Sequence, residues 1–335
     1  MNRDFLEPFL KIRGAEYNSK RRRLHVPLDN NGGNLTTVFF SPYVMVQRIE
    51  IHSHTIPDFS STIDETCYLK INYCQSGRCE LSLNNGERTY LSGGELAVDT
   101  GQATDSFYYP NAEYTGIEIF VFLDSDWRND LTLLGESVEI PNTLAENCKK
   151  HSRPQIIQTD YETKSIAEGI GSLIESQAEY TRVYLKFLEL LFALQYKDFT
   201  NGKQKRSFYT STQSEIAKRV YDKISGDLDI RYTAKELAAD FGVSETSLKT
   251  YFRGVYGCGY AEFQQNLRMK RAADLLAQTD KKVIDIALSV GYKSQPKFGA
   301  AFKERYKVSP LEYRRRCKFE NKTEGDNNVL GKRCV

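Results

Sequence analysis

The sequence lacks the features that would place it in a membrane or direct it out of the cell. Its 335 residues contain no run of 18 apolar residues, so we expect no transmembrane helix. The opening stretch, MNRDFLEPFLKIRG, is charged and short of apolar residues, which argues against a secretory signal. We therefore expect a cytoplasmic protein. Hydrophobic residues make up 40% and aromatic residues 12%, which excludes a disordered or fibrous chain and is enough for two folded domains.

Cysteine motifs are missing as well. The seven cysteines are odd in number, irregularly spaced and without a CxxC pair. Cys67, Cys74 and Cys79 form the only cluster, and no fourth ligand for zinc lies near them in the sequence. We expect reduced cytosolic thiols on strands and no metal site.

Histidine is scarce, with four residues in the whole chain. A metal-binding barrel of the cupin type needs a His pair, a Glu and a later His. His52 and His54 supply a pair, but the strands expected from 69 to 122 contain no histidine, so we predict surface or core histidines, no metal and no cofactor. No Ser-His-Asp order and no glycine-rich phosphate loop stands out, so we predict no catalytic residue. Several aromatic residues could line an apolar pocket or fill a core: Tyr68, Tyr73, Phe107, Tyr108, Tyr109 and Trp127.

The net charge of +2 conceals an uneven distribution. Residues 1–201 contain 19 Lys and Arg against 28 Asp and Glu, a balance of −9. Residues 202–318 contain 24 against 13, a balance of +11. An acidic half joined to a basic half indicates that only the second half meets a polyanion.

The N-terminal half reads as β-structure followed by helices. From about 36 to 124, short stretches rich in β-branched and aromatic residues alternate with turns, which predicts a small antiparallel barrel or sandwich. From 161 to 198 the period becomes helical, with a core stripe of Val183, Phe187, Leu190, Leu191 and Leu194. Leu185, Leu188 and Phe192 lie off that stripe. A helix that is apolar on more than one side indicates a homodimer through 161–198 or, alternatively, packing within the domain alone.

The C-terminal half repeats itself at a spacing of 49–50 residues. The stretch ELAADFGV at 236–243 matches DIALSVGY at 285–292, and Leu248 and Phe252 match Phe298 and Phe302. Each copy has the signals of a helix-turn-helix: a glycine (Gly242 or Gly291) ends the first helix, and the apolar pair faces inward on the second.

Capping residues mark the starts of these helices. Thr233 and Glu236 form a capping box, Ser244 and Ser294 can each cap a second helix, and Ser309-Pro310-x-Glu312 opens a closing helix. Between the copies we expect a helix at roughly 260–276, a spacer of roughly 25 Å at 1.5 Å per residue. Two recognition helices on a stiff spacer can enter successive major grooves roughly 34 Å apart.

Residues 214–316 resemble the DNA-binding domain of the AraC/XylS family of bacterial transcriptional regulators. The resemblance is carried by KELAADFGVSETSLKTYFRGVYG and by RMKRAADLLAQTDKKVIDIALSVGYKSQPKFGAAFKERYKVSPLEYRRR. It implies an α+β protein of two domains: a cupin-like β-barrel with a helical pair at 1–200 and a tandem helix-turn-helix domain at 214–318. The composition of the intervening stretch, which has Gly, Lys, Ser and Thr without a period, predicts a linker at 201–213, and we expect a disordered tail at 319–335. Lys307 and Pro296 depart from the family pattern, which often has Gly and Ser there, without threatening the fold.

The resemblance also implies roles for individual residues. Thr246, Lys249 and Thr250 occupy base-facing positions on the first recognition helix, and Gln295, Lys297 and Ala300 face outward on the second. At its position Thr250 could contact a thymine methyl group, and Gln295 could pair with an adenine edge. Phosphate contacts are assigned to four further residues: Arg253, Lys293, Lys303 and Arg305.

Three classes of function stay open for the N-terminal half. In the first, the chain is a regulator, activating or repressing, that senses a small effector, dimerises, binds double-stranded DNA at the nucleoid and meets RNA polymerase. In the second, an enzyme is fused to the DNA-binding domain, as in repair alkyltransferases that use four zinc-bound cysteines, where this chain offers three with poor spacing. In the third, a partner protein replaces the small molecule.

Overall fold

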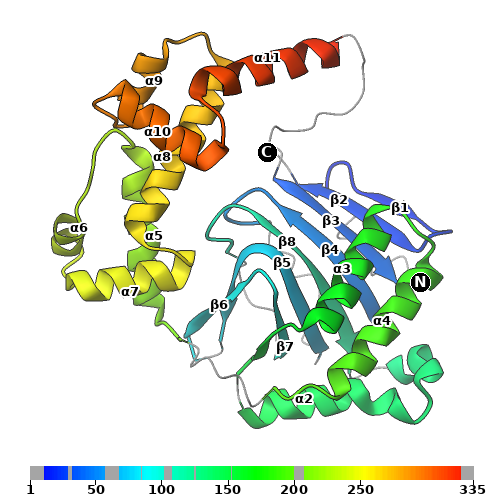
Figure 1. The fold of residues 1–335 in the computed structure, drawn as a ribbon. Helices are drawn as coiled ribbons and strands as arrows, with labels where there is room; N and C mark the ends of the chain where they lie inside the picture. The colour runs from blue at the N-terminus through cyan, green and yellow to red at the C-terminus, as the bar shows by residue number, and fades with distance from the viewer. Residues whose placement is uncertain are drawn as a thin grey trace. The chain divides into compact units, whose positions relative to one another are not determined.

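The structure, a computed structural model, describes residues 11–28, 32–56, 68–83, 85–101, 108–123, 126–151, 153–199 and 207–325. The chain forms two compact parts, Met1–Ser211 and Thr212–Val335, which are described separately below (Figure 1). In the described residues no helix is both long enough and apolar enough to cross a membrane.

The N-terminal part is built on an antiparallel sheet of nine strands, with the order β1-β2-β3-β4-β8-β5-β7-β9 and with β6 paired to β5. The strands are β1 (Glu16–Asn18), β2 (Arg23–Leu28), β3 (Gly33–Phe39), β4 (Val44–Ile51), β5 (Tyr68–Ser82), β6 (Arg88–Ser92), β7 (Glu95–Gly101), β8 (Tyr114–Phe122) and β9 (Gln155–Gln158). The antiparallel β-structure that the sequence predicts is therefore present.

The sheet is not closed, so the prediction of a small cupin-like barrel is not met by the described strands. β1 pairs only with β2 and β9 pairs only with β7, which leaves these two strands as opposite ends of the strand order. The sheet instead separates two apolar cores, one on each face. The central strand β8 reflects this arrangement, since it is buried along almost its whole length rather than at alternate residues.

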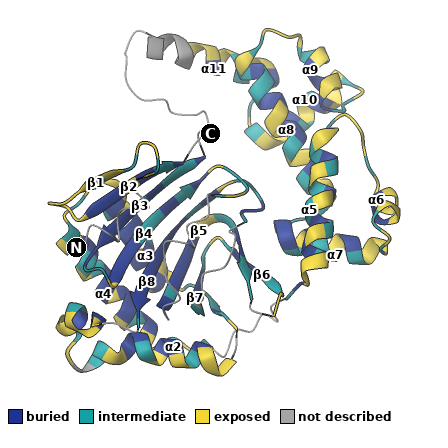
Figure 2. Ribbon diagram, turned by 180° about the vertical axis from the view of Figure 1, so that it is seen from behind, coloured by how far each residue is buried: buried dark blue, intermediate teal, exposed yellow. Residues whose placement is uncertain are grey.

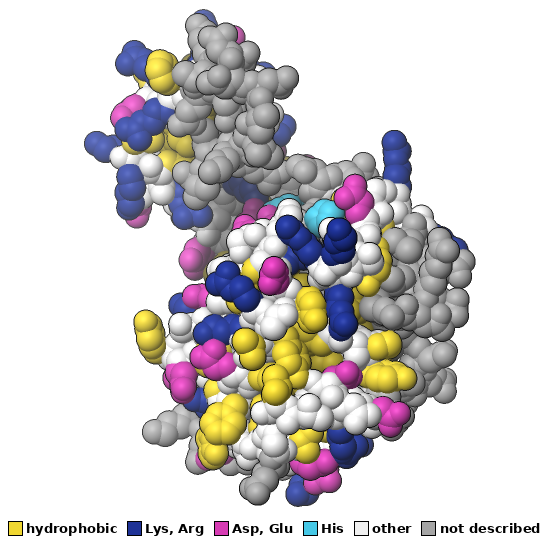
Figure 3. Space-filling model, turned by 90° about the vertical axis from the view of Figure 1, so that its right-hand side faces the viewer, with side chains coloured by type: hydrophobic (Ala, Val, Ile, Leu, Met, Phe, Trp, Pro, Cys, Tyr) yellow, Lys and Arg dark blue, Asp and Glu magenta, His cyan; other side chains and the backbone are white. Residues whose placement is uncertain are grey.

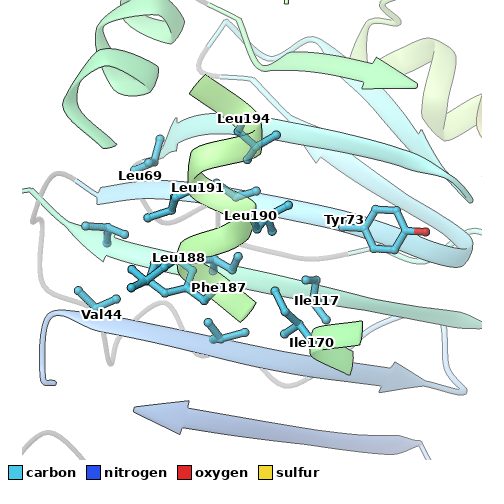
Figure 4. Close-up of a cluster of buried hydrophobic side chains, with 14 of the residues drawn as sticks. Val44, Leu69, Tyr73, Ile117, Ile170, Phe187, Leu188, Leu190, Leu191 and Leu194 are labelled. Atoms are coloured by element: carbon cyan, nitrogen blue, oxygen red, sulfur yellow. The ribbon is translucent and has the colours of Figure 1, made fainter. Parts of the chain in front are cut away.

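Helices cover one face of this sheet (Figure 1). They are η3 (Trp127–Glu139), α2 (Ile140–His151), α3 (Tyr161–Glu175) and α4 (Tyr180–Gln195). The predicted core stripe of α4 is confirmed, since all five of its residues are fully buried. Figure 4 shows Leu190, Leu191 and Leu194 of α4 among sheet side chains such as Leu69 and Ile117. Burial of each such side chain stabilises the fold by about 1.5–3 kcal/mol.

The other positions of α4 divide between core and surface. Leu188 joins the core, whereas Leu185 is 54% exposed and Phe192 is 48% exposed. Tyr196, which follows the helix, is 72% exposed. Leu185, Phe192 and Tyr196 are seven and four residues apart, so they lie along one stripe of the helix surface. We call these three residues the outer α4 stripe.

Part of the predicted linker at 201–213 is docked on the N-terminal part. Tyr209 pairs with Arg88 of β6 through two backbone hydrogen bonds of 2.8 and 2.9 Å, and its side chain is buried. The centre of its ring lies 6.2 Å from that of Tyr90. The guanidinium carbon of Arg153 lies 4.0 Å from the centre of the neighbouring Phe208 ring. Residues 201–206 lie outside the described residues. The chain is therefore attached to the sheet immediately before the helical part begins.

The C-terminal part is all helical in its described elements. The helices are α5 (Ser211–Gly226), α6 (Ala234–Asp240), α7 (Glu245–Tyr256), α8 (Tyr260–Gln278), α9 (Val283–Ser289), α10 (Gln295–Tyr306) and α11 (Pro310–Gly325). The burial colours in Figure 2 show helices with one buried and one exposed side. The spacer α8 is two residues longer than expected. Helix α11 continues to Gly325, into the stretch where we predicted a tail, and residues 326–335 lie outside the described residues.

Candidate nucleic-acid interface

The predicted repeat is confirmed as two helix-turn-helix motifs of the same dimensions. The first motif consists of α6 and α7 and the second of α9 and α10, with helices of 7 and 12 residues in each. Gly242 and Gly291 make the turns with φ of 64° and 79°, the left-handed conformation expected of them. Leu248, Phe252, Phe298 and Phe302 are buried as predicted, which leaves the opposite sides of α7 and α10 outward.

Most of the predicted caps are present. Thr233 and Glu236 make a complete capping box at the start of α6. The Ser244 side chain accepts a hydrogen bond from the Ser247 backbone at 3.1 Å, and that of Ser309 accepts one from Glu312 at 3.2 Å. These bonds satisfy backbone donors that a helix start leaves open.

The predicted cap by Ser294 is wrong. Ser294 precedes α10, but its side chain makes no capping hydrogen bond. Pro296 stands in the first turn of this helix and has no backbone N–H, so one of the two donors that such a cap serves is absent.

The predicted contact residues of α7 share one side of the helix. The three base-facing candidates, Thr246, Lys249 and Thr250, and the phosphate candidate Arg253 are all exposed and recur at spacings of three and four residues. The Thr250 hydroxyl donates to the Thr246 carbonyl at 2.8 Å, so the donor is used within the helix. The sequence analysis missed that Lys249 is paired with Glu245 at 3.2 Å, although their spacing of four residues was a signal for it.

The six candidate residues of the second motif are also exposed. Lys293 precedes α10, and the other five lie along it: Gln295, Lys297, Ala300, Lys303 and Arg305. Lys297, Ala300 and Lys303 are spaced by three residues, on the side away from buried Phe298 and Phe302. On the face drawn in Figure 3, Lys and Arg side chains stand out over the helical part. The structure thus leaves all ten predicted residues accessible on or beside the second helices of the two motifs.

The phosphate candidates differ from the basic residues of α11. Arg316 pairs with Glu312 at 2.6 Å, Arg314 donates to the Lys281 carbonyl at 2.6 Å, and Lys318 pairs with Asp280. Within the described residues, the side chains of Arg253 and Lys293 make no such pair. A cation without an internal partner keeps its full charge available for a phosphate.

Two polar side chains that the sequence analysis passed over lie buried in the middle of α8. Gln264 is 4% exposed and Arg268 is 8% exposed. Both donate to the backbone carbonyl of Ile230, at 3.0 and 2.9 Å. Their signal in the sequence was an amide and a cation beside the apolar stripe of this helix, at positions one turn apart.

The histidines and aromatic residues of the N-terminal part make ordinary structural contacts. His52 lies 3.3 Å from a Glu50 oxygen, and His54 lies 3.1 Å from the Tyr109 carbonyl. No group of three metal-ligating side chains occurs among the residues that the structure describes. The aromatic residues that fill the cores are Tyr68, Tyr73, Tyr109 and Trp127, while Tyr108 is half-buried and Phe107 lies outside the described residues.

A polar network crosses the second face of the sheet. Lys70 and Glu118 form an ion pair at 2.7 Å, and Glu118 also accepts from Asn72 at 3.0 Å. Tyr114 donates to Asn72 at 2.6 Å. Burial lowers the pKa of Lys70, but the adjacent Glu118 carboxylate outweighs this and the pKa is raised. The lysine is therefore charged and fully paired inside the sheet domain.

The buried thiols are suited to packing and not to nucleophilic chemistry. Cys74, Cys79 and Cys148 are free and buried, and burial raises the pKa of Cys74 and of Cys148 to about 12. Burial also raises the pKa of Cys79. A thiol held protonated is a poor nucleophile and metal ligand. Cys67 lies outside the described residues.

The family match lies in the helical part. A helix-turn-helix domain family matches residues 237–316. The HTH-type transcriptional activator AarP of Providencia stuartii is 33% identical over 106 residues, which are 32% of this chain and 78% of AarP. The HTH-type transcriptional regulator MtrA of Neisseria gonorrhoeae is 33% identical over 100 residues, 30% of this chain, and the match spans about a third (32%) of MtrA's length.

Among solved structures, the C-terminal domain of AraT, a response regulator from Geobacillus stearothermophilus, is 32% identical with a TM-score of 0.29. That match covers 30% of this chain and 84% of the AraT domain. The match at 33% identity covers most of AarP, 78% of its length. The chain therefore belongs to the AraC/XylS family of transcriptional regulators.

Proposed function

We propose that this protein regulates transcription by binding double-stranded DNA with both helix-turn-helix motifs of one chain, α7 and α10 entering adjacent major grooves. The observation that carries the proposal is the equal size of the two motifs together with the exposure of all ten candidate residues. The balance of +11 over residues 202–318 supplies the attraction to phosphate. The name of the AarP relative supports a role as an activator, which acts on RNA polymerase.

The N-terminal part is proposed to dimerise through the outer α4 stripe. The opposite side of α4 already packs on the sheet (Figure 4). The exposed apolar side chains of Leu185, Phe192 and Tyr196 therefore do not contribute to the hydrophobic core of the domain. A second copy of the chain would cover the same stripe with its own, as a two-fold interface does.

The DNA proposal is tested with the full-length chain and sites selected from random duplexes. We expect selected sites in which the protein protects two tracts about one helical turn apart, with an affinity that falls steeply as salt rises. Double replacement of Lys249 and Lys297 by alanine should weaken specific binding by about tenfold or more. Selection that yields no preferred sequence, or footprints of a single tract, would contradict the proposal.

The dimer proposal is tested by sedimentation. Leu185→Glu with Phe192→Glu should convert the dimer to a monomer, because two charges would be buried at the interface. Leu133→Glu is the matched control, since it makes the same change at an apolar residue of η3 that is 69% exposed and lies outside α4. A wild-type chain that sediments as a monomer at all concentrations would count against this interface.

The signal that reaches the N-terminal part is proposed to be a small effector. Thermal-shift measurements on the full chain against metabolite sets test this, with a shift on one class as the expected result. The alternative of a partner protein is favoured if no compound shifts the transition and a protein does. The alternative of an enzymatic N-terminal part has little support, because three of the thiols it could use are buried with raised pKa.

A further inference from the structure

The spacer α8 takes part in the cores of both helix-turn-helix motifs. Near its start, the Phe263 ring lies 5.5 Å from Phe252 and 5.0 Å from Tyr256 of α7. Towards its end, Met269 and Leu276 belong to the core that contains Phe298 and Phe302 of α10. Between Phe263 and Met269, α8 therefore passes from the core of the first motif to the core of the second.

Three segments of the chain meet at that stretch. Gln264 and Arg268 of α8 both donate to the carbonyl of Ile230, which lies in the loop before α6 of the first motif. The turn of the second motif closes on the same place. A Cβ atom built on Gly291 would lie 3.0 Å from the Arg268 guanidinium carbon and 3.0 Å from the Asp229 carbonyl oxygen. We call Gln264, Arg268, the Ile230 carbonyl and Gly291 the inter-motif joint.

The residues of the joint hold two backbone segments in a fixed arrangement, at some cost to the free energy of folding. The Arg268 Nε atom is buried without a hydrogen-bond partner, and burial lowers the pKa of Arg268. A well-packed apolar side chain would avoid that desolvation cost. What the arginine provides instead is a planar group with directed donors, which holds two backbone segments at one distance and angle.

We propose that Arg268, supported by Gln264, is a positioning residue that fixes the orientation of the two motifs and thereby sets the spacing between the two DNA tracts that the protein reads. The inference rests on the proposed function, in which both motifs bind one duplex. Each inserted base pair moves one tract away from the other by about 3.4 Å along the DNA axis. If the joint holds the two motifs rigidly, both cannot bind their tracts at the changed spacing and the affinity falls.

The repeat offers an internal control for this role. Gly242 occupies the turn of the first motif that Gly291 occupies in the second, and both have positive φ. No atom lies within 4 Å of a Cβ built on Gly242, whereas a Cβ on Gly291 would press on the Arg268 guanidinium. Alanine at either position strains the backbone, but only alanine at 291 disturbs the joint.

The experiment measures binding of the full-length protein to a duplex selected by the wild type, and to versions with one base pair inserted or removed between the two protected tracts. We expect the wild type to bind the altered spacings about tenfold more weakly. Arg268→Met should bind the three spacings within about threefold of one another, and Arg268→Lys should restore part of the discrimination. Gly291→Ala should flatten the preference as Arg268→Met does, and Gly242→Ala should not.

The outcomes separate the two proposals. If the wild type protects one tract only, or is indifferent to spacing, the reading by both motifs is wrong and the joint has no role in it. If the wild type is sensitive and Arg268→Met keeps the same ratios, the joint alone is wrong. Circular dichroism and thermal melting establish that each variant is folded, and should Arg268→Met fail to fold, the Gly291→Ala and Gly242→Ala pair decides.

Discussion

The two recognition helices end on different residues at the same position of the repeat. Gly257 closes α7 and Lys307 closes α10, with φ of 81° and 63°. Each backbone N–H bonds back to the helix, to Arg253 and Lys303 respectively, at 2.8 Å. Lys307 departs from the family pattern, which often has Gly there, and the departure places a residue with a side chain in the left-handed conformation, which disfavours a Cβ.

Replacing Lys307 by glycine should stabilise the protein. The strain of the left-handed lysine would be removed, and part of the gain would be offset by the greater freedom of glycine in the unfolded chain. We expect an increase of about 0.5–1 kcal/mol in the free energy of unfolding, measured as a rise in the urea midpoint. Gly257→Lys is the reciprocal variant and should lower the midpoint by a similar amount. An unchanged or lower midpoint for Lys307→Gly would show that the side chain is not strained.

Removing either partner of the buried pair Lys70 and Glu118 should destabilise the N-terminal part strongly. Lys70→Met or Glu118→Gln leaves one buried group without its partner, at a cost of about 3–5 kcal/mol. The double variant should cost less than the sum of the two, which calorimetry can measure. Because the pKa of Lys70 is raised above 10.5, the stabilisation linked to the lysine's charge is present as the pH approaches 10.5 and is lost as the pH rises through the raised pKa. Additive effects would show that the two groups do not interact.

At the scale of helices and strands, the sequence was most informative where signals are local. The capping box at Thr233 and the turn at Gly291 depend on a few neighbouring residues, and both are present. The cap by Ser294 failed for an equally local reason, the proline two residues later. The attachment of Tyr209 to β6 could not be predicted. Its partner Arg88 is 121 positions away, and Tyr209 itself lies in a stretch whose composition predicts a polar linker.

Tyr209→Ala should release the segment before α5 from the sheet. The buried ring contributes about 1.5–3 kcal/mol to docking, so its loss raises the open population of residues 207–210 by about tenfold or more. Limited proteolysis followed by mass spectrometry should show faster cleavage within residues 207–210. Ser207→Ala is the control, because the bond from Thr89 to residue 207 uses its backbone carbonyl. Equal cleavage rates in the two variants would mean that the ring does not hold the segment.

At the scale of the whole molecule, the uneven charge and the internal repeat predicted the helical part correctly, whereas the strand patterns did not predict how the sheet is arranged. The uneven charge identified the half that carries the family match, and the repeat identified both motifs. Closure of a barrel depends on which distant strands pair, and β-rich segments give no local sign of that. The buried length of β8 is consistent with a sheet between two cores, which no alternation in the sequence marked. The buried positions of Gln264 and Arg268 could not be predicted, because polar residues on a helix usually face solvent and these two face inward.

The two roles proposed for the exposed residues, phosphate contact and base contact, predict different dependences of DNA affinity on salt concentration and on DNA sequence. We propose that Arg253 and Lys303 contact phosphates. Arg253→Ala and Lys303→Ala should then each weaken binding to all duplexes alike and reduce the slope of log K against log salt by about 1. Gln295→Ala should leave the slope unchanged and cost about 1–3 kcal/mol at one base pair of the selected site only. Both quantities come from fluorescence titrations of the full chain at several salt concentrations. A reduced slope for Gln295→Ala, or a base-specific loss for Arg253→Ala, would reverse the assignment and place Arg253 in the groove.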